Sequence, residues 1–414
     1  MASESRLLKY IRKYFDRLGI RKMDNVEEAL RQSVGEERMK TIMAEWDRIL
    51  PPSGSLENPV NGSAPRKSGE FPAEHTDLYD LINDDMETSM VIGSFTDADI
   101  WQKCCLWLME HQNGISSPAL EVGCGNGVIT CFLASIKPEV QFVGIDRSQN
   151  SIKIANQIKE KLGISNVRFE VMTAEEITDR YNTVLSFRTI HENIGAKYTW
   201  YKFESFSKQI ELYEQLYSAY IKVLGNLVVE DGKLFSVERN EFDTEFLAMM
   251  NNYKDCGLSL ERDSAELLEC RESNIADNTR LTAYIMSKTG TCSEDDLFEK
   301  WAALAFDKNV ITRAQADYVL ETQGGKLISG FASFDENGTP CGKFGIYGVN
   351  GDPDSFFYYQ ANPEVIRLNR FPMSHILEAM ESLKRTRKHD HESGFSLIDL
   401  ETVDWGYAVR NEED

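Results

Sequence analysis

The chain has 414 residues, of which 42% are hydrophobic, and this length is more than one ordinary domain needs, so we expect two or three domains. The formal net charge of -22 at pH 7 would repel a phosphate backbone, and it therefore argues against a nucleic-acid substrate. There is no CxxC pair, no apolar signal-peptide core and no apolar run that could span a bilayer, so we expect a cytoplasmic protein without a metal site or a membrane partner.

Residues 1–50 predict an N-terminal helical region. Between residues 5 and 19, apolar side chains recur at helical spacing and basic side chains occupy the other side, which indicates an amphipathic helix. Such a helix can lie on a membrane or bind a partner, but docking on the acidic body of the same chain is the simpler expectation. Two further helices are predicted at 26–35 and 37–49. Residues 51–75 are rich in Pro, Gly, Ser and Asn, and we expect them to form a linker.

Residues 76–289 predict a single α/β domain. Helices at 77–90 and 97–111 are expected to cover it. Beyond them, short apolar runs alternate with helical patterns, and this order requires parallel strands joined by crossover helices. The predicted strands are 119–123, 142–146, 167–171, 183–187 and 234–238, the later helices are 202–224 and 244–256, and the closing antiparallel pair is 258–262 with 281–287.

Residues 290–414 predict a separate α+β accessory module. A helical stretch at 294–317 precedes β-like segments with turn signals between them, and a final helix is expected at 374–387. The β-like segments lie around 326–334, 342–349 and 355–359. The His-Asp-His sequence at 389–391 offers too few ligands in a charged tail, so we expect no metal there.

The chemistry is expected where the first predicted strand passes into a helix, because Glu121 is followed there by a Gly-x-Gly-x-Gly loop at 123–127. Glycines let the backbone turn sharply and approach a ligand closely. The loop is also similar to the dinucleotide fingerprint, and Asp146 at the end of the second strand would suit a ribose in either class of enzyme. Glu121 distinguishes between the two classes of enzyme, because a carboxylate beside the loop suits a cationic ligand and would repel the pyrophosphate of a dinucleotide.

Together, Glu121 to Gly127, Asp146 and the Ala174-Glu175 pair resemble motifs I, II and III of the class I S-adenosylmethionine-dependent methyltransferases. The resemblance covers residues 97–287. It implies a Rossmann-like sheet with helices on both faces, with S-adenosyl-L-methionine as the cofactor and S-adenosyl-L-homocysteine as the product. One departure is Thr173, where the family often has an acid that binds the adenine amino group.

The resemblance also implies roles for individual residues. The loop would hold the methionine part of the cofactor, Asp146 the ribose, and Arg147 would flank the adenine. Ala174 and Glu175 would lie beside the adenine edge. The implied cofactor-binding residues are Glu121, Gly123, Cys124, Gly125, Asn126, Asp146, Arg147, Thr173, Ala174, Glu175 and Phe187.

The residues after the fourth predicted strand face the transferable methyl group in this fold. His191 is expected either to act there as a base, oriented by Glu192, or only to support the pocket. Arg188 would clamp a substrate carboxylate or make a structural salt bridge. An aromatic run and the end of the fifth strand supply further substrate candidates, namely Tyr198, Trp200, Tyr201, Glu238 and Arg239.

The sequence thus predicts methyl transfer from S-adenosyl-L-methionine to an oxygen or nitrogen atom of a small molecule, such as a secondary metabolite. The acidic composition favours this substrate class. The alternative is a peptide or protein methyltransferase in which the accessory modules capture the polypeptide. A third hypothesis is a non-catalytic scaffold, but the retention of Glu121, the glycines and Asp146 argues against it.

Overall fold

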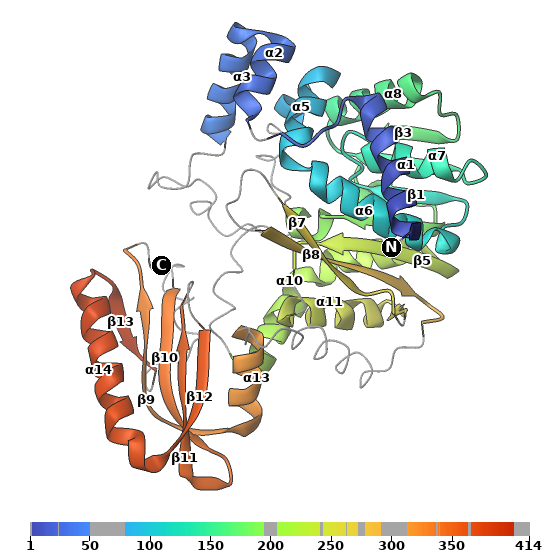
Figure 1. Cartoon of the computed structure of the whole chain (residues 1–414). Coiled ribbons are helices and arrows are strands. Elements are labelled where there is room, and N and C mark those ends of the chain that lie inside the picture. Colours follow the sequence, from blue (N-terminus) through green and yellow to red (C-terminus); the bar gives the residue numbers. More distant parts are fainter. Residues whose placement is uncertain are drawn as a thin grey trace. The chain divides into compact units, whose positions relative to one another are not determined.

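The structure is a computed structural model, and its residues fall into two compact units (Figure 1). The first unit comprises Met1–Ala196, Leu216–Glu241 and Met249–Leu297, and the second comprises Lys197–Gln215, Phe242–Ala248 and Phe298–Asp414. The second unit therefore includes two short segments from before residue 290, which the sequence placed in the α/β domain. The residues described are 2–23, 25–49, 79–193, 205–240, 243–261, 263–271, 278–290, 313–336, 338, 340–362 and 366–400, so the predicted linker lies outside them.

The first unit is built on an eight-stranded sheet of order β3-β2-β1-β4-β5-β8-β6, with β7 paired to β8. Its strands are β1 (Ala119–Val122), β2 (Phe142–Asp146), β3 (Val167–Val171), β4 (Tyr181–Phe187), β5 (Val228–Glu238), β6 (Ser259–Leu260), β7 (Glu266–Arg271) and β8 (Asn278–Ser287). Strands β1 to β5 are parallel, and β8 runs antiparallel to β5. This confirms the predicted α/β class. The strand order reverses between β1 and β4, and ligands of such sheets bind at this point.

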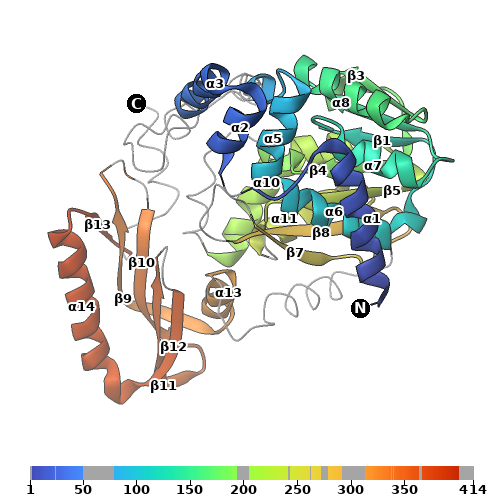
Figure 2. The same cartoon turned by 45° about the horizontal axis from the view of Figure 1, so that its top comes forward.

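Helices cover both faces of the sheet (Figures 1 and 2). These helices are α6 (Ala98–Glu110), α7 (Val128–Ile136), α8 (Gln149–Leu162), α10 (Phe206–Asn226) and α11 (Thr244–Asp255). On one face, Trp107 of α6 packs edge-on against Phe235 of β5, with ring centroids 5.9 Å apart. On the other face, Tyr253 of α11 packs against Tyr284 of β8 at 6.1 Å. Because neighbouring strand residues alternate between faces, both layers bury the same strands.

The predicted helix at 77–90 is interrupted, and this is a correction to the sequence analysis. Residues 79–82 are helical, and a new helix, α5 (Met86–Thr96), begins after Asp85. The Asp85 side chain accepts a hydrogen bond from Thr88 N at 2.9 Å, so it caps α5 at its start. The chain therefore turns at residues 83–85 and brings α5 against α6 and α8.

Three helices form the N-terminal region, namely α1 (Ala2–Leu18), α2 (Val26–Val34) and α3 (Glu36–Ile49). α1 packs on α6 through its buried apolar side, which includes Ile11 and Leu18. The Tyr14 hydroxyl of α1 donates a hydrogen bond to the Val128 carbonyl at 2.7 Å. The basic side of α1 is exposed. The amphipathic helix thus docks on its own chain by its apolar face and leaves its cations in solvent.

The second unit contains a five-stranded antiparallel sheet of order β12-β11-β10-β9-β13. Its elements are α13 (Arg313–Gln323), β9 (Gly324–Phe334), β10 (Pro340–Val349), β11 (Asp352–Ala361), β12 (Ile366–Pro372), α14 (Ile376–Glu392) and β13 (Ser396–Asp399). Leu383 of α14 packs with Phe331 and Phe344 on one face, and Ala316 of α13 packs with Tyr359 on the other. Strands β12 and β13 were not predicted, and residues 294–312 of the predicted helix lie outside the described residues.

Three further observations concern the described part of the chain as a whole. None of its helices combines the length and the apolar composition that crossing a membrane would require. Its cysteines are free thiols. Its His, Cys, Asp and Glu side chains form no group of three or more that could hold a metal ion.

Candidate active site

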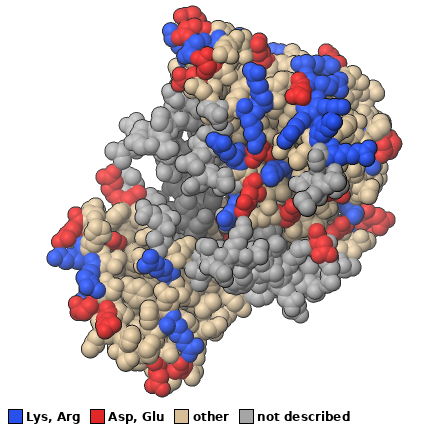
Figure 3. All heavy atoms as spheres, viewed as in Figure 1, with Lys and Arg blue, Asp and Glu red and all other residues tan. Residues whose placement is uncertain are grey.

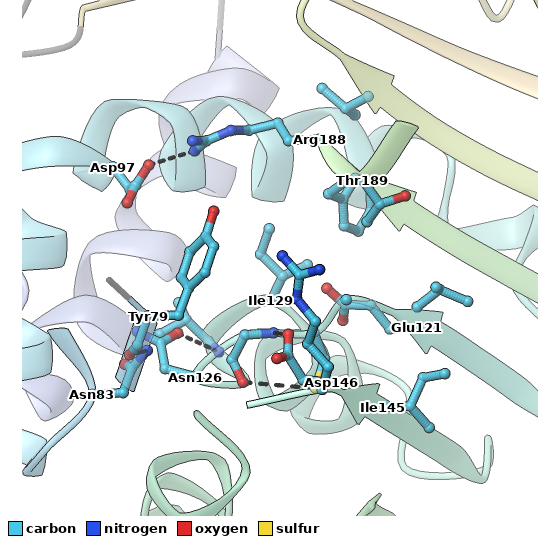
Figure 4. Close-up of a pocket in the computed structure, with 18 of the residues that line it drawn as sticks. Tyr79, Asn83, Asp97, Glu121, Asn126, Ile129, Ile145, Asp146, Arg188 and Thr189 are labelled. Atoms are coloured by element: carbon cyan, nitrogen blue, oxygen red, sulfur yellow. Dashed lines mark hydrogen bonds and ion pairs between the residues drawn. The ribbon is translucent and has the colours of Figure 1, made fainter. Parts of the chain in front are cut away.

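A pocket of about 250 Å³ lies at the carboxyl ends of β1, β2 and β4, where the strand order reverses (Figure 4). The loops that follow β1, β2, β3 and β4 form one wall, and the segment from Tyr79 to Trp101 contributes to the other. The structure brings together at this pocket every residue that the sequence proposed for the cofactor. These are Glu121, Gly123, Cys124, Gly125, Asn126, Asp146, Arg147, Thr173, Ala174, Glu175 and Phe187.

The glycine loop turns through left-handed backbone conformations. Gly123 has φ +67° and Gly125 has φ +52°, a region that side-chain-bearing residues rarely adopt. A Cβ atom on Gly123 would lie 2.7 Å from Cγ2 of Thr189, whereas a Cβ atom on Gly125 would meet nothing within 4 Å. Gly123 is therefore fixed by packing against the turn after β4. Gly125 leaves its backbone open to a ligand.

Asp146 connects the second strand to this loop. Its Oδ2 accepts a hydrogen bond from Gly125 N at 2.9 Å, and its Oδ1 accepts one from Ser148 N, also at 2.9 Å. The carboxylate is thus held in one orientation at the pocket wall. Each oxygen keeps a further lone pair, so the group can also accept hydrogen bonds from two adjacent hydroxyls of a ligand.

Glu121 is a buried carboxyl group in the pocket wall, with 2% of its surface exposed. Its Oε2 accepts a hydrogen bond from Thr130 Oγ1 at 2.5 Å. Burial raises the pKa of Glu121 to about 8, the Thr130 hydrogen bond opposes this rise, and the charge of Asp146 adds to it. A carboxyl group in such surroundings is stabilised in its charged form by a cation, so these residues fit a sulfonium ligand.

The turn after β3 supplies a further part of the wall. It forms a short helix, Ala174–Glu176, and Thr173 N donates a hydrogen bond to Oε2 of Glu176 at 2.7 Å. Thr173 occupies the place where the family often has an acid. Since Glu175 also lines the pocket, it supplies a carboxylate two residues further along.

The second wall was not predicted from the sequence. Ser89 of α5 connects it to the glycine loop, because Ser89 Oγ donates to Oδ1 of Asn83 at 2.7 Å and accepts from Nδ2 of Asn126 at 3.1 Å. Asn83 also donates to Ser151 Oγ of α8 at 2.9 Å. The sequence signal nearest to this wall is the polar pair Thr88 and Ser89 near the start of α5. That signal does not indicate a binding site by itself.

On the acceptor side, Arg188 follows β4 directly and lines the pocket. It has φ +62°, and its backbone N donates to the Val237 carbonyl at 2.7 Å. Its guanidinium group forms an ion pair with Asp97, with Nη1 and Oδ1 2.5 Å apart. The salt-bridge alternative of the sequence analysis is thus present in the structure.

His191 faces a buried polar cluster instead of the pocket. Its side chain is 9% exposed, and its Nδ1 lies 3.6 Å from Oε2 of the fully buried Glu238. Its Nε2 lies 3.4 Å from the Tyr217 hydroxyl. Because His191 is not among the residues that line the pocket, its position gives no support to a role as the catalytic base.

Residues 116–276 match a family model described as a methyltransferase domain. The matched segment contains the glycine loop, Asp146 and the turn at Thr173–Glu175. This segment is a methyltransferase domain. By their resemblance to the class I motifs, residues of this segment would bind S-adenosyl-L-methionine. The matched segment begins after the second pocket wall along the chain, so residues 79–101 lie outside it.

The methyltransferase domain also matches individual proteins. A tRNA/tmRNA (uracil-C(5))-methyltransferase of Neisseria meningitidis is 29% identical over 132 residues, which are 31% of this chain and 36% of that protein. A tRNA (guanine-N(7)-)-methyltransferase of Microcystis aeruginosa is 35% identical over 63 residues, which are 15% of this chain and 30% of that protein. The chain thus spans about a third of the length of these curated relatives.

Among solved structures, the magnesium protoporphyrin IX methyltransferase of Synechocystis PCC 6803 with bound S-adenosylmethionine is similar to this chain. The alignment covers 63% of this chain and 97% of that protein, with 16% identity and a TM-score of 0.32. A similarity at this level gives no information about the substrate of this chain.

Two of the remaining predicted substrate residues, Glu238 and Arg239, are described by the structure and do not line the pocket. Glu238 is fully buried under the turn after β4, where Ile190 N donates to its Oε1 at 3.5 Å. Arg239 is exposed and outside the pocket lining. The side chain of Glu192 and the residues Tyr198, Trp200 and Tyr201 lie outside the described residues.

Proposed function

We propose that this methyltransferase transfers a methyl group to an oxygen or nitrogen atom of a small molecule. The main observation in support of this proposal is the second pocket wall. Hydrogen bonds from Ser89 to Asn83 and from Asn126 to Ser89 join this wall to the glycine loop and confine the site. Tyr79 and Trp101 add aromatic surface to that wall. A confined, partly apolar pocket with a few fixed polar groups suits a small acceptor.

In this proposal the residues of the chain bind the cofactor and align the acceptor with its methyl group. The cofactor supplies an electrophilic methyl group on a sulfonium when it is bound. Asp146 accepts hydrogen bonds from the ribose hydroxyls, and Glu121 stabilises the positive charge. Arg147 and the turn at Thr173–Glu175 enclose the adenine. Holding the acceptor in line with the methyl group lowers the barrier of such a displacement, because the entropy of orientation is lost on binding.

His191 has a positioning role in the proposal. The fully buried Glu238 contacts His191 and also accepts from Ser186 Oγ at 3.4 Å, while Ser186 Oγ lies 2.6 Å from Thr189 Oγ1. These contacts lie directly beneath the turn that carries Arg188. The cluster therefore fixes the turn, and the turn presents Arg188 to the pocket.

Isothermal titration calorimetry of S-adenosyl-L-methionine and S-adenosyl-L-homocysteine tests the cofactor half of this proposal, with NAD as the control ligand. We expect micromolar affinity for the first two and no heat from NAD. A screen of small-molecule acceptors with a labelled methyl donor then tests the substrate half. Labelling of peptides in a parallel screen, with none of the small molecules labelled, would support the peptide or protein alternative.

Two observations favour a second candidate, a structured RNA as the acceptor. The curated relatives from Neisseria meningitidis and Microcystis aeruginosa are named as tRNA methyltransferases. In addition, Figure 3 shows lysine and arginine side chains gathered over α1 and the adjoining part of α8. The exposed cations there include Lys9, Arg12, Lys13, Arg17 and Lys161.

The small-molecule proposal ranks above this candidate for two reasons. The net charge of -22 opposes binding to a polyanion, and the similarity to the tRNA enzymes extends over only 31% and 15% of this chain. A transfer assay with unfractionated tRNA at low and moderate salt distinguishes the two. If tRNA is methylated and the rate falls as the salt concentration rises, RNA replaces the small molecule as the proposed acceptor. The same result would overturn the exclusion of nucleic acid that was based on net charge.

A further inference from the structure

An acidic and a basic side chain meet at the side of the pocket away from Asp146. Asp97 lies between α5 and α6, and Arg188 lies in the turn after β4, so the two come from opposite walls. Their side chains are 25% and 21% exposed, so water screens this ion pair less than it screens a fully exposed one. Figure 4 shows the pair above Tyr79, with Asp146 on the other side of the pocket.

Neither partner of this ion pair has the arrangement that its local sequence position favours. Arg188 has φ +62°, a region that residues with a side chain seldom occupy. Asp97 is the residue before α6, where an aspartate normally caps the helix, yet its side chain makes no capping hydrogen bond. Its Oδ2 accepts instead from Thr96 Oγ1 at 2.8 Å, and its Oδ1 faces Arg188. Local conformational preference therefore does not account for the pairing. Backbone strain of the kind seen at Arg188 is concentrated at ligand sites in proteins.

The charges of the pocket also limit what the pair can bind. Among the described residues that line the pocket, the basic side chains are Arg147 and Arg188. Arg147 follows Asp146 directly, at the end assigned to adenosine. Arg188 thus places a guanidinium group at the other end of the pocket, and Asp97 places a carboxylate beside it.

We propose that Asp97 and Arg188 bind the α-amino-acid part of the cofactor. The Asp97 carboxylate receives the α-ammonium group, and the Arg188 guanidinium group binds the α-carboxylate through paired N–H donors. An ion pair and a zwitterion are both neutral overall, so their contact buries no uncompensated charge. The inference rests on the proposed assignment of adenosine to Asp146 and the turn at Thr173–Glu175. Asp97 lies outside the segment that the family model matches.

The test compares two ligands that share the adenosine part and the sulfur atom and differ in the other group attached to the sulfur. S-adenosyl-L-homocysteine carries the α-amino acid, and 5′-methylthioadenosine lacks it. Affinities for both are measured by calorimetry with the full chain and with the variants Asp97→Asn and Arg188→Gly. Glycine is chosen because it tolerates the φ of +62° at this position, and thermal melting of each variant verifies that it is folded.

We expect both variants to lose about tenfold or more in affinity for S-adenosyl-L-homocysteine, because each removes a charge-assisted contact. Their affinity for 5′-methylthioadenosine should stay within about twofold of the unmodified chain, because this ligand makes neither contact. Arg147→Met is the matched control, and it should weaken both ligands by the same factor.

Each other outcome overturns the inference in a recognisable way. Unchanged affinity for S-adenosyl-L-homocysteine in folded variants would show that the pair does not bind the amino acid and would leave Arg188 for the acceptor. An equal loss for both ligands would make the pair a support of the pocket wall. If the unmodified chain bound neither ligand, the cofactor assignment itself would fail, together with the proposed function.

Discussion

Gly125 donates its backbone N–H to the carboxylate of Asp146 at 2.9 Å, so the ribose candidate also holds the glycine loop in place. Asp146→Ala removes the proposed ribose contact and this support together. We expect it to weaken binding of S-adenosyl-L-methionine by at least about tenfold, since hydrogen bonds to a charged group contribute about 1.5–3 kcal/mol. Calorimetry with the folded variant measures this, and unchanged affinity would contradict the ribose assignment.

The raised pKa of Glu121 predicts that the relative affinity for cofactor and product depends on pH. With its pKa raised to about 8 by burial, the carboxyl group is protonated at neutral pH and becomes charged as the pH rises. The charged form favours the cationic sulfonium of S-adenosyl-L-methionine over the neutral thioether of S-adenosyl-L-homocysteine. The ratio of the two affinities should therefore increase between about pH 6 and about pH 9. Glu121→Gln should give a constant ratio, and the same slope in that variant would rule out Glu121 as the titrating group.

The same carboxyl group predicts how stability depends on pH. The pKa of Glu121 is raised from 4.5 to about 8 in the folded chain, so the folded state retains a proton that the unfolded state releases. Its contribution to stability is complete below about pH 4.5 and is lost as the pH rises through about 8. Denaturant unfolding at several pH values measures this contribution as the difference between the unmodified chain and Glu121→Gln. A difference that did not change with pH would contradict the raised pKa.

The two glycines of the loop should respond differently to alanine. Gly125→Ala should cost about 1–2 kcal/mol, because it strains the backbone at φ +52° and meets no neighbour within 4 Å. Gly123→Ala should cost more, because its Cβ would lie 2.7 Å from Thr189 Cγ2 in addition to the strain at φ +67°. Thermal unfolding of the two variants measures the order. Equal losses would show that the Thr189 side chain moves aside without cost.

Substitution of His191 should affect stability more than cofactor binding. His191→Ala removes the contacts with Glu238 and Tyr217 and should destabilise the fold by about 2–4 kcal/mol, because a buried carboxyl group loses a partner. Affinity for S-adenosyl-L-homocysteine should fall by less than about threefold, since His191 does not line the pocket. A stable variant with a strongly reduced transfer rate would instead restore the catalytic-base hypothesis.

Much of the first unit could be predicted because its central strands, β1 and β2, are buried almost throughout. β1 to β3 are short apolar runs between helical patterns, and their predicted bounds agree with the structure to within one residue. The glycine loop and Asp146 were found because their spacing is fixed by the strand-loop-helix geometry. Edge strands such as β7 and β12 were missed, because exposed charged residues alternate with apolar ones in sequences like Glu266–Arg271.

The second pocket wall could not be predicted for a different reason. Asn83, Ser89 and Asp97 belong to the site only because the chain turns at residues 83–85 and returns over the glycine loop. No spacing within residues 79–101 encodes that return. His191 shows the opposite case: its place after β4 suggested catalysis, but its ring lies near the buried carboxyl group of Glu238 and is not part of the pocket lining.

The division of the pocket between two walls affects how its specificity can change. The motifs that identify the family lie within residues 116–276, whereas α5 and the start of α6 lie outside that segment. Substitutions at positions such as Tyr79 or Trp101 can therefore reshape the pocket without altering the glycine loop, Glu121 or Asp146. The shape of the pocket can therefore diverge among descendants of this protein while every family motif stays intact, and a fragment trimmed to residues 116–276 would keep the motifs but lack the second pocket wall.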